Sequence, residues 1–154
     1  MTVLLTTQVD QHFTRAKSGT IWGTVYFELD EGQFFPNQDW TDLTVACVRN
    51  WLEMTLTLAE GTVSSNDIPF YDGPVRIEAT ATDSGMVDLR FLHRDVVKYT
   101  AKANSRDLLD NALMVGRQLM ANCAERNWSN RDTDSLAMWI DRATQYVERN
   151  RRAQ

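Results

Sequence analysis

The stretch FFPNQDW, residues 34–40, stands where the hydrophobic pattern of the chain changes its period. Before it, residues 20–30 (TIWGTVYFELD) alternate along two faces and are rich in β-branched and aromatic side chains, which predicts a strand. From Trp40 to Gly61, apolar residues recur at spacings of three and four, which predicts a helix. We therefore expect the phenylalanines to end the strand, the proline to block its continuation, and Asp39 to cap the helix.

Further strands are predicted wherever apolar and polar residues alternate on either side of this helix. They cover residues 3–9, 75–82, 86–93 and 96–103. The turn DSG at 83–85 predicts a tight hairpin between two of them. Residues 10–19 and 62–74 hold turn formers without a hydrophobic period, so we expect loops there.

The last third of the chain has the period of a helix, with Ser105 as a candidate N-cap, a break at residues 127–130 and a final helix that ends in arginines. Strands, one interposed helix, more strands and two helices predict an α+β fold. We expect an antiparallel sheet of about five strands, with three helices packed mainly on one face. A length of 154 residues fits one compact unit, so residues 1–154 are predicted to form a single α+β domain.

The net charge of −5 conceals an asymmetry along the chain. Residues 1–88 contain thirteen acids and four bases, whereas residues 89–154 contain eight acids and twelve bases. One interpretation is that the two parts neutralise each other within one domain. The other is an acidic face that attracts a basic protein and repels nucleic acid.

The N-terminal sequence has no basic region followed by an apolar run, and no stretch approaches the roughly 20 apolar residues of a membrane helix. We therefore expect cytoplasmic residence and no membrane contact. The two cysteines, Cys47 and Cys123, lie on apolar helical stripes and form no C-x-x-C pair. They are predicted to be buried, reduced and without a redox role.

The chain offers little for catalysis. Its two histidines, His12 and His93, do not stand at metal-ligand spacing from Cys, Asp or each other, and the common phosphate-binding glycine motifs are missing from the sequence. The paired carboxylates all fall in predicted turns or helix starts, where acids are common for structural reasons. We expect no enzyme activity, no catalytic residue, no metal and no cofactor.

Direct nucleic-acid binding is not expected either. Basic side chains alternate along the predicted strands of residues 86–103, but the chain as a whole is acidic, with an isoelectric point near 5.0, and contains no zinc-finger or RRM signature. A solvated strand face accounts for these bases.

Protein recognition remains, because two segments combine carboxylates with aromatic rings. Residues 28–42 (ELDEGQFFPNQDWTD) hold five carboxylates and three aromatics, and residues 67–72 (DIPFYD) add two of each. Aromatics surrounded by charge are typical of interface hot spots. The alternative is that the rings anchor the helix entry to the core. The predicted partner-binding residues are Asp30, Glu31, Asp39, Asp42, Asp67, Tyr71 and Asp72.

The order of these motifs resembles a known family. A strand with aromatic ends precedes F-P-x-x-x-W-x-D at residues 35–42, a helix with a further tryptophan at Trp51, and F-Y-D-G-P at residues 70–74. This order resembles small bacterial immunity proteins of polymorphic toxin systems, including contact-dependent growth inhibition, over about residues 20–93. The resemblance implies binding and neutralisation of a cognate toxin domain in the cytoplasm, without cofactor or catalysis.

The toxins of that family are often nucleases. The resemblance therefore implies that an acidic surface would occupy a basic substrate cleft. Two alternatives stay open from the residues themselves. One is a small α+β enzyme or ligand-binding domain with a pocket between helix and sheet. The other is a homo-oligomer in which Trp22 and Tyr26 are buried between subunits.

Overall fold

The computed structural model describes residues 2–153, apart from the side chain of Glu31, and has an α+β fold. The α+β prediction is confirmed, but the strands form two antiparallel sheets instead of one sheet of about five strands. The first sheet consists of β1 (Val3–Gln8), β2 (Thr14–Arg15), β3 (Ile21–Leu29), β4 (Phe34–Phe35) and β5 (Thr41–Asp42). The second is a meander of β6 (Ser65–Pro69), β7 (Val75–Ala81), β8 (Met86–His93) and β9 (Val96–Asn104).

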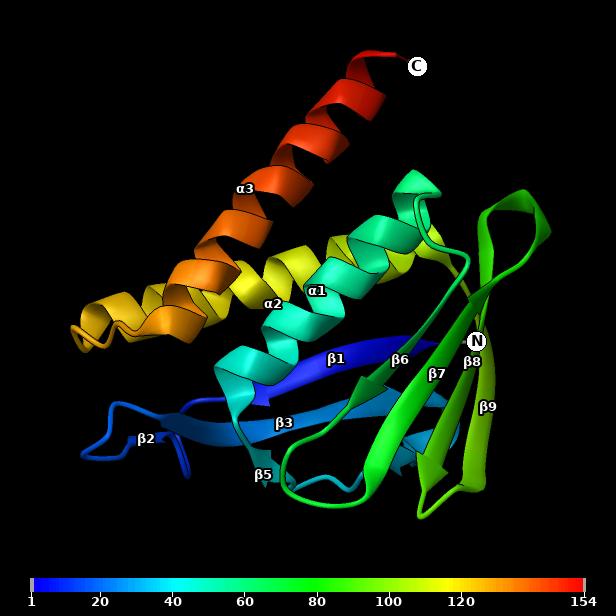
Figure 1. Ribbon diagram of the computed structural model, residues 1–154. Coiled ribbons are helices and arrows are strands. Elements are labelled where there is room, and N and C mark those ends of the chain that lie inside the picture. The colour runs from blue at the N-terminus through cyan, green and yellow to red at the C-terminus, as the bar shows by residue number, and fades with distance from the viewer. Residues whose placement is uncertain (1, 154) are drawn as a thin grey trace.

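Three helices gather on one side of the sheets (Figure 1). They are α1 (Thr44–Glu60), α2 (Ser105–Glu125) and α3 (Arg131–Arg152). Short 3₁₀ turns at Asp30–Gly32 and Asp83–Gly85 follow β3 and β7. The three predicted helices and the five predicted strands are all present, with small differences at their ends. The N-cap of α2 is Asn104, one residue before the predicted Ser105, and its side chain accepts hydrogen bonds from the N–H groups of Arg106 and Asp107.

The start of α1 differs from the prediction for a tertiary reason. The helix begins at Thr44 after Leu43, so Asp39 is not its N-cap and Trp40 is not in its first turn. Thr41 and Asp42 form β5 instead of helix, and they pair with Gly23 and Thr24 of β3, the central strand of the first sheet. Strand pairing therefore takes the positions that helical periodicity alone assigned to the helix.

A second difference concerns the segment predicted as a loop at residues 62–74. Its first part forms β6, an edge strand registered along β7 from Ser65 with Thr80 to Pro69 with Arg76. Proline at the end of an edge strand is compatible with sheet pairing. Turn residues and acids hid this strand, because it has no apolar alternation of its own.

The core lies between the inner faces of the two sheets and the helices. Phe27 at the middle of β3 packs edge-on against Trp51 of α1, with ring centroids 4.5 Å apart, and also against Phe91 of β8 at 5.9 Å. Phe35 of β4 reaches the same ring of Phe91 at 5.2 Å. All four rings are at most 2% exposed, so Phe35, the second phenylalanine of the FFPNQDW stretch, is an anchor of the core.

Both cysteines are buried and free, as predicted, in α1 and α2. Tyr26 on the other face of β3 is also buried, at 4% exposure. It is covered within the chain by Phe34, whose ring lies 5.8 Å away, and by Gln8, whose side-chain amide donates to its hydroxyl at 3.2 Å. The pKa of Tyr26 is raised by this burial and by the nearby Glu28 carboxylate. No second subunit is needed to bury this ring.

Candidate protein-binding surface

Asp42 at the end of β5 is fully buried and joins two distant segments of the chain. Its carboxylate accepts hydrogen bonds from the backbone N–H of Leu43 at 2.7 Å and from those of Tyr71 and Asp72, each at 3.1 Å. The indole Nε1–H of Trp40 donates to the same carboxylate at 2.9 Å. One buried charge is thus satisfied by four donors, as an anion away from water requires.

This cluster, which we call the Asp42 junction, contains both halves of the motif that carries the family resemblance. Asp42 and Trp40 come from F-P-x-x-x-W-x-D, and residues 70–73 come from F-Y-D-G-P. The ring of Trp40 lies 6.3 Å from Phe70 and over Gly73, where a Cβ would come within 3.0 Å of the indole. The motif therefore describes a packed structural joint rather than a row of exposed groups.

The thiol of Cys47 lies beside the junction, where it interacts with Asp42 and the backbone of Tyr71. Burial raises its pKa well above the ordinary value of 9.0, and the negative charge of Asp42 raises it further. Cys123 in α2 has a raised pKa for the same main reason, its burial. Since the thiolate is the nucleophile, neither thiol is activated near neutral pH.

The junction places a group of polar side chains at the surface. Tyr71 is 50% exposed, and its hydroxyl accepts a hydrogen bond from the side-chain amide of Asn50 in α1 at 2.6 Å. Asp72 is exposed next to it, and exposed Asp39 adjoins Trp40. We call Asp39, Tyr71 and Asp72 the Tyr71 surface. The carboxylate below them fixes the backbone of residues 71 and 72, while their side chains face solvent.

An open groove of about 660 Å³ adjoins Tyr71. It runs between the first turns of α1, the loop before β3 and the start of α3. Its lining side chains are mostly polar: Ser18, Thr20, Arg49, Asn50, Tyr71, Asn130, Arg131, Asp132 and Ser135. Arg49 is held by Ser135 at 2.9 Å and is paired with Glu53, so this guanidinium is already neutralised.

The structure separates the other acids that the sequence grouped together. Asp30 follows the far end of β3, where its carboxylate accepts from the N–H of Thr2 at 2.7 Å. Asp42 lies beside Gly23, seven residues back along this strand, which corresponds to about 20 Å. Glu31 follows Asp30, and its side chain lies outside the described part of the structure. Asp30 does not belong to the Tyr71 surface.

Asp67 of β6 is exposed but belongs to an ion-pair ladder on the outer face of the second sheet. Arg76 of β7 contacts the carboxylates of Asp67 at 3.1 Å, Glu78 at 2.9 Å and Asp95 at 2.8 Å. Hydrogen bonds to Asp95 and Glu78 raise the pKa of this arginine above its usual value. Asp67 therefore presents less uncompensated charge than the sequence implies.

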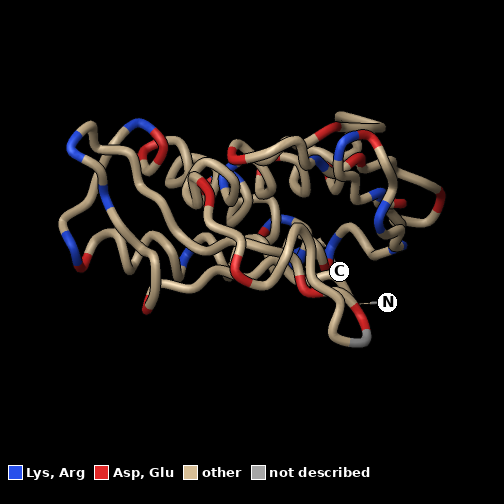
Figure 2. The backbone as a smooth tube through the Cα atoms, turned by 90° about the horizontal axis from the view of Figure 1, so that it is seen from below, with Lys and Arg blue, Asp and Glu red and all other residues tan. Residues whose placement is uncertain are grey.

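The charge asymmetry along the chain does not give the folded protein one acidic and one basic face. Figure 2 shows basic residues interspersed with acidic ones around the fold. Three ion pairs connect the acidic and basic parts of the sequence: Arg76 with Asp95, Arg90 with Glu78, and Lys102 with Asp88. On the outer face of the second sheet, the acidic N-terminal part and the basic C-terminal part of the sequence therefore neutralise each other, which is the first of the two interpretations.

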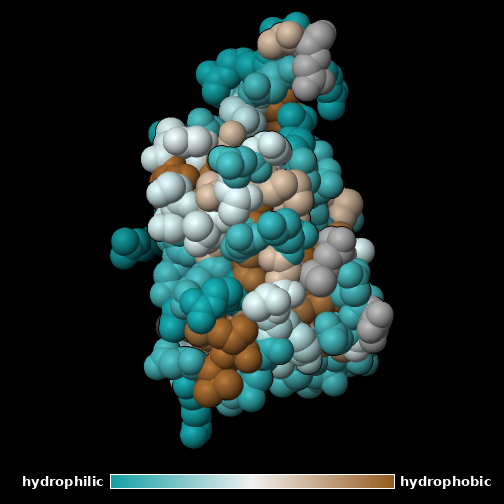
Figure 3. All heavy atoms as spheres, turned by 90° about the vertical axis from the view of Figure 1, so that its right-hand side faces the viewer, coloured by the Kyte–Doolittle hydropathy of each residue, from teal (hydrophilic) through white to brown (hydrophobic). Residues whose placement is uncertain are grey.

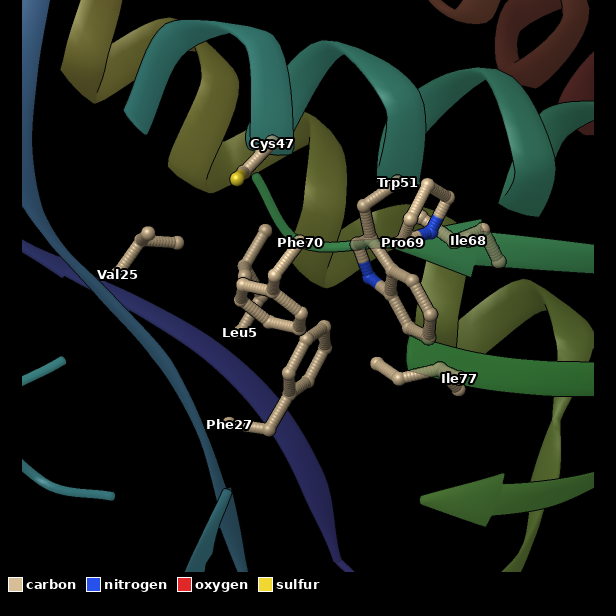
Figure 4. Close-up of a pocket in the computed structure, with 9 residues that line it drawn as sticks. All are labelled: Leu5, Val25, Phe27, Cys47, Trp51, Ile68, Pro69, Phe70 and Ile77. Carbon is tan, nitrogen blue, oxygen red and sulfur yellow. The ribbon is translucent and has the colours of Figure 1, made fainter. Parts of the chain in front are cut away.

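The region between α1 and the sheets contains a cavity lined by apolar side chains (Figure 4). Its volume is about 10 Å³, which is room for a single water molecule. A pocket between helix and sheet that could hold a larger ligand is therefore not formed at this place. Both histidines are exposed, and His93 lines a separate groove beside Trp40 and Tyr99.

Among residues 2–153, no group of three or more His, Cys, Asp or Glu side chains is placed to hold a metal ion. Within the same residues, no helix has the length and apolar character required to cross a membrane. Comparisons with protein-family models, with curated proteins and with solved structures find no match.

Of the seven residues selected from the sequence, Tyr71 and Asp72 are exposed side by side at the junction, and Asp39 is exposed next to Trp40. Asp42 is a correction, because a fully buried carboxylate cannot contact a partner. Sequence reasoning missed Asn50, which orients the Tyr71 hydroxyl. A polar residue in a helix carries no signal of this role, since its partner lies 21 residues further along the chain.

Proposed function

We propose that this protein is an immunity protein that binds and neutralises a cognate bacterial toxin domain in the cytoplasm, and that the Tyr71 surface contacts the toxin. The observation that carries the proposal is the Asp42 junction. Both motif halves that resemble immunity proteins converge on one buried carboxylate, with Tyr71 and Asp72 exposed above it and Asp39 exposed next to Trp40.

The geometry suits rigid recognition. A half-exposed tyrosine held by Asn50 loses little conformational freedom on binding, and tyrosine is a common anchor of protein interfaces. The exposed carboxylates of Asp72 and Asp39 would attract a basic cleft such as that of a nuclease, and would accelerate association. Occlusion of the toxin's active site requires no catalysis, metal or cofactor in this chain.

The direct test is co-expression with the toxin domain encoded by a neighbouring open reading frame. The wild-type chain is expected to restore growth and to co-purify with the toxin. The variants Tyr71→Ala and Asp39→Lys/Asp72→Lys should lower affinity, by about tenfold or more for the charge reversals. The lost affinity of the charge variant should appear mainly in the association rate.

A matched control is Asp83→Lys, at the opposite end of β7 from the junction. Asp83 is exposed, so its reversal makes the same charge change as Asp72→Lys alone without touching the Tyr71 surface, and these two single variants are compared directly. Unchanged affinity in the control together with weakened binding in the surface variants supports the proposal. Equal weakening in both would show that the overall field acts instead, and failure of wild type to protect or co-purify would refute the proposal.

A ligand-binding domain is the second candidate, and one observation favours it. The groove beside Tyr71 has the volume of a small-molecule site. Its mostly polar lining departs from the apolar walls typical of such sites. A metabolite screen by thermal shift distinguishes the two functions, since a ligand that stabilises the free protein and loses its effect in Asn50→Ala would favour this candidate.

A further inference from the structure

The long outer strands of the two sheets differ in what lies along their outer edges. β1 is covered by α2, where the side chain of Asn111 accepts from the N–H of Leu5 at 2.8 Å and its amide faces the carbonyl of Leu5 at 3.5 Å. This side chain occupies the place of a further strand. β9 ends the order β6-β7-β8-β9, and in the described residues its registered strand partner is β8. The outer edge of β9 is thus available for pairing along nine residues, with a β-bulge at Lys98, where the register to β8 shifts.

An apolar patch lies at the beginning of this edge. Val96 and Val97 are 56% and 37% exposed and follow the turn formed by Arg94 and Asp95. Figure 3, in which the right-hand side of Figure 1 faces the viewer, shows a hydrophobic patch near the lower end of the molecule, bordered by hydrophilic residues. A groove of about 260 Å³ adjoins the strand, between Tyr99 and residues 35–40.

The basic side chains of β9 favour a binding partner of particular charge. Lys98 and Lys102 are exposed, and Lys98 makes no ion pair within the described residues. If two copies paired antiparallel along all nine residues, the symmetry axis would pass through Thr100 and place Lys98 of each copy opposite Lys102 of the other. Like charges directly opposite destabilise a strand pair. A strand with carboxylates at these positions gains two attractive contacts instead.

We propose that β9 binds an extended acidic segment of another protein, which adds as a further strand to the β6–β9 sheet. The backbone groups of β9 supply the ladder of hydrogen bonds, and Lys98 and Lys102 select acidic side chains. Val96 and Val97 contact an apolar residue of the segment. This surface is distinct from the Tyr71 surface, and the inference does not depend on the proposed function.

The test uses a synthetic capped peptide of about nine residues in which Glu or Asp alternates with Val and Thr, matching the length of β9. Two control peptides have lysine in place of the acids or proline in place of every second residue. Binding is followed by amide chemical shifts and amide hydrogen exchange of the full chain. We expect the acidic peptide to shift and protect amides of β9, and the proline peptide to have no effect.

Charge reversal is the decisive variant. Lys98→Glu/Lys102→Glu should weaken the acidic peptide about tenfold and make the lysine peptide the better ligand. Because Lys102 lies 3.5 Å from Asp88, Lys98→Glu alone is the second variant, which leaves this ion pair intact. Lys17→Glu is the matched control for Lys98→Glu, since it makes the same charge change in the exposed loop before β3 and should leave binding unchanged.

Three results would overturn the proposal. One is equal binding of the acidic and lysine peptides, and another is the absence of β9 shifts at peptide concentrations of about 1 mM. The third is a free protein that sediments as a dimer with protected β9 amides, because the occupant of the edge would then be a second copy. No toxin enters this experiment, so its failure leaves the proposed function standing.

Discussion

Asp42 and Asp67 are the same residue type, and both belong to the acidic segments of the sequence, but the fold places them in opposite environments. Asp42 is 0% exposed and receives four hydrogen bonds from backbone and indole N–H groups. Asp67 is exposed and meets Arg76 at 3.1 Å on a solvated sheet face. The first connects two segments of the chain, and the second belongs to a shared ion-pair ladder.

This difference shows why a count of carboxylates does not locate a binding surface. A buried anion with fixed donors has a large effect on stability, because its loss leaves those donors without partners. An exposed anion in a ladder has a small effect, because water and neighbouring charges replace it. Asp39 and Asp72 combine exposure with a place in the chain next to the Asp42 junction, and the backbone of Asp72 is held by Asp42 itself.

The largest effect is expected from Asp42→Ala. Three backbone N–H groups and one indole N–H lose their acceptor, so the free energy of unfolding should fall by about 3 kcal/mol or more. Urea unfolding monitored by tryptophan fluorescence measures the change, and Asp39→Ala is the control for loss of a nearby exposed carboxylate. A loss below about 1 kcal/mol for Asp42→Ala would contradict the structural role of the junction.

Gly73→Ala is the next largest expected effect. Gly73 has a φ of +155°, and an added Cβ would lie 3.0 Å from the indole of Trp40, so the substitution combines backbone strain with a clash. We expect a loss of about 1–3 kcal/mol. The control is Gly32→Ala, where φ is also positive, at +71°, but nothing lies within 4 Å of the added atom. Equal losses in the two variants would remove the packing of Trp40 from the explanation.

The pH dependence of the free energy of unfolding tests the burial of Cys47 beside the Asp42 junction. The folded state raises the pKa of Cys47, so above pH 9 the unfolded chain releases this thiol proton while the folded chain retains it. This contribution to stability is complete below the ordinary pKa and decreases as the pH rises. Between pH 9 and 10, Cys47→Ala should reduce the decline of the unfolding free energy by about 1 kcal/mol per pH unit.

Denaturant unfolding at several pH values tests the role of Cys47, with Cys123→Ala as the comparison. Burial also raises the pKa of the Cys123 thiol, but no carboxylate raises it further, and the charge of Arg126 lowers it. The change in slope should therefore be larger for Cys47→Ala. An identical pH dependence in wild type and Cys47→Ala would show that this thiol does not titrate differently in the two states.

The sequence predicted the elements whose patterns are local. Alternation over 75–82 and 86–93 predicted a hairpin that the structure confirms, because each strand has one buried face. The start of α1 and the existence of β6 depend on pairing with β3 and β7, and a single sequence does not contain that information.

The same limit applies to the candidate site. Tyr71 and Asp72 could be selected by composition, since they stand in an aromatic and acidic segment. Whether an acid is buried or exposed depends on which backbone groups approach it from residues far along the chain. For Asp42 these groups come from residues 71 and 72, about 30 positions away. No local pattern distinguishes such an acid from a helix cap.

The smallest effect is expected from Asp67→Asn, and it sharpens the comparison with Asp42. Arg76 retains Glu78 and Asp95 as partners, and exposed ion pairs contribute little to stability, so the midpoint of thermal unfolding should stay within about 2 °C of wild type. Addition of 0.5 M NaCl should leave this small difference unchanged or reduce it, because salt screens the exposed pair. If Asp67→Asn instead lowered stability as much as Asp42→Ala, the ladder on the second sheet would be a structural joint of the same kind, and the distinction between buried and exposed acids would no longer identify the Tyr71 surface.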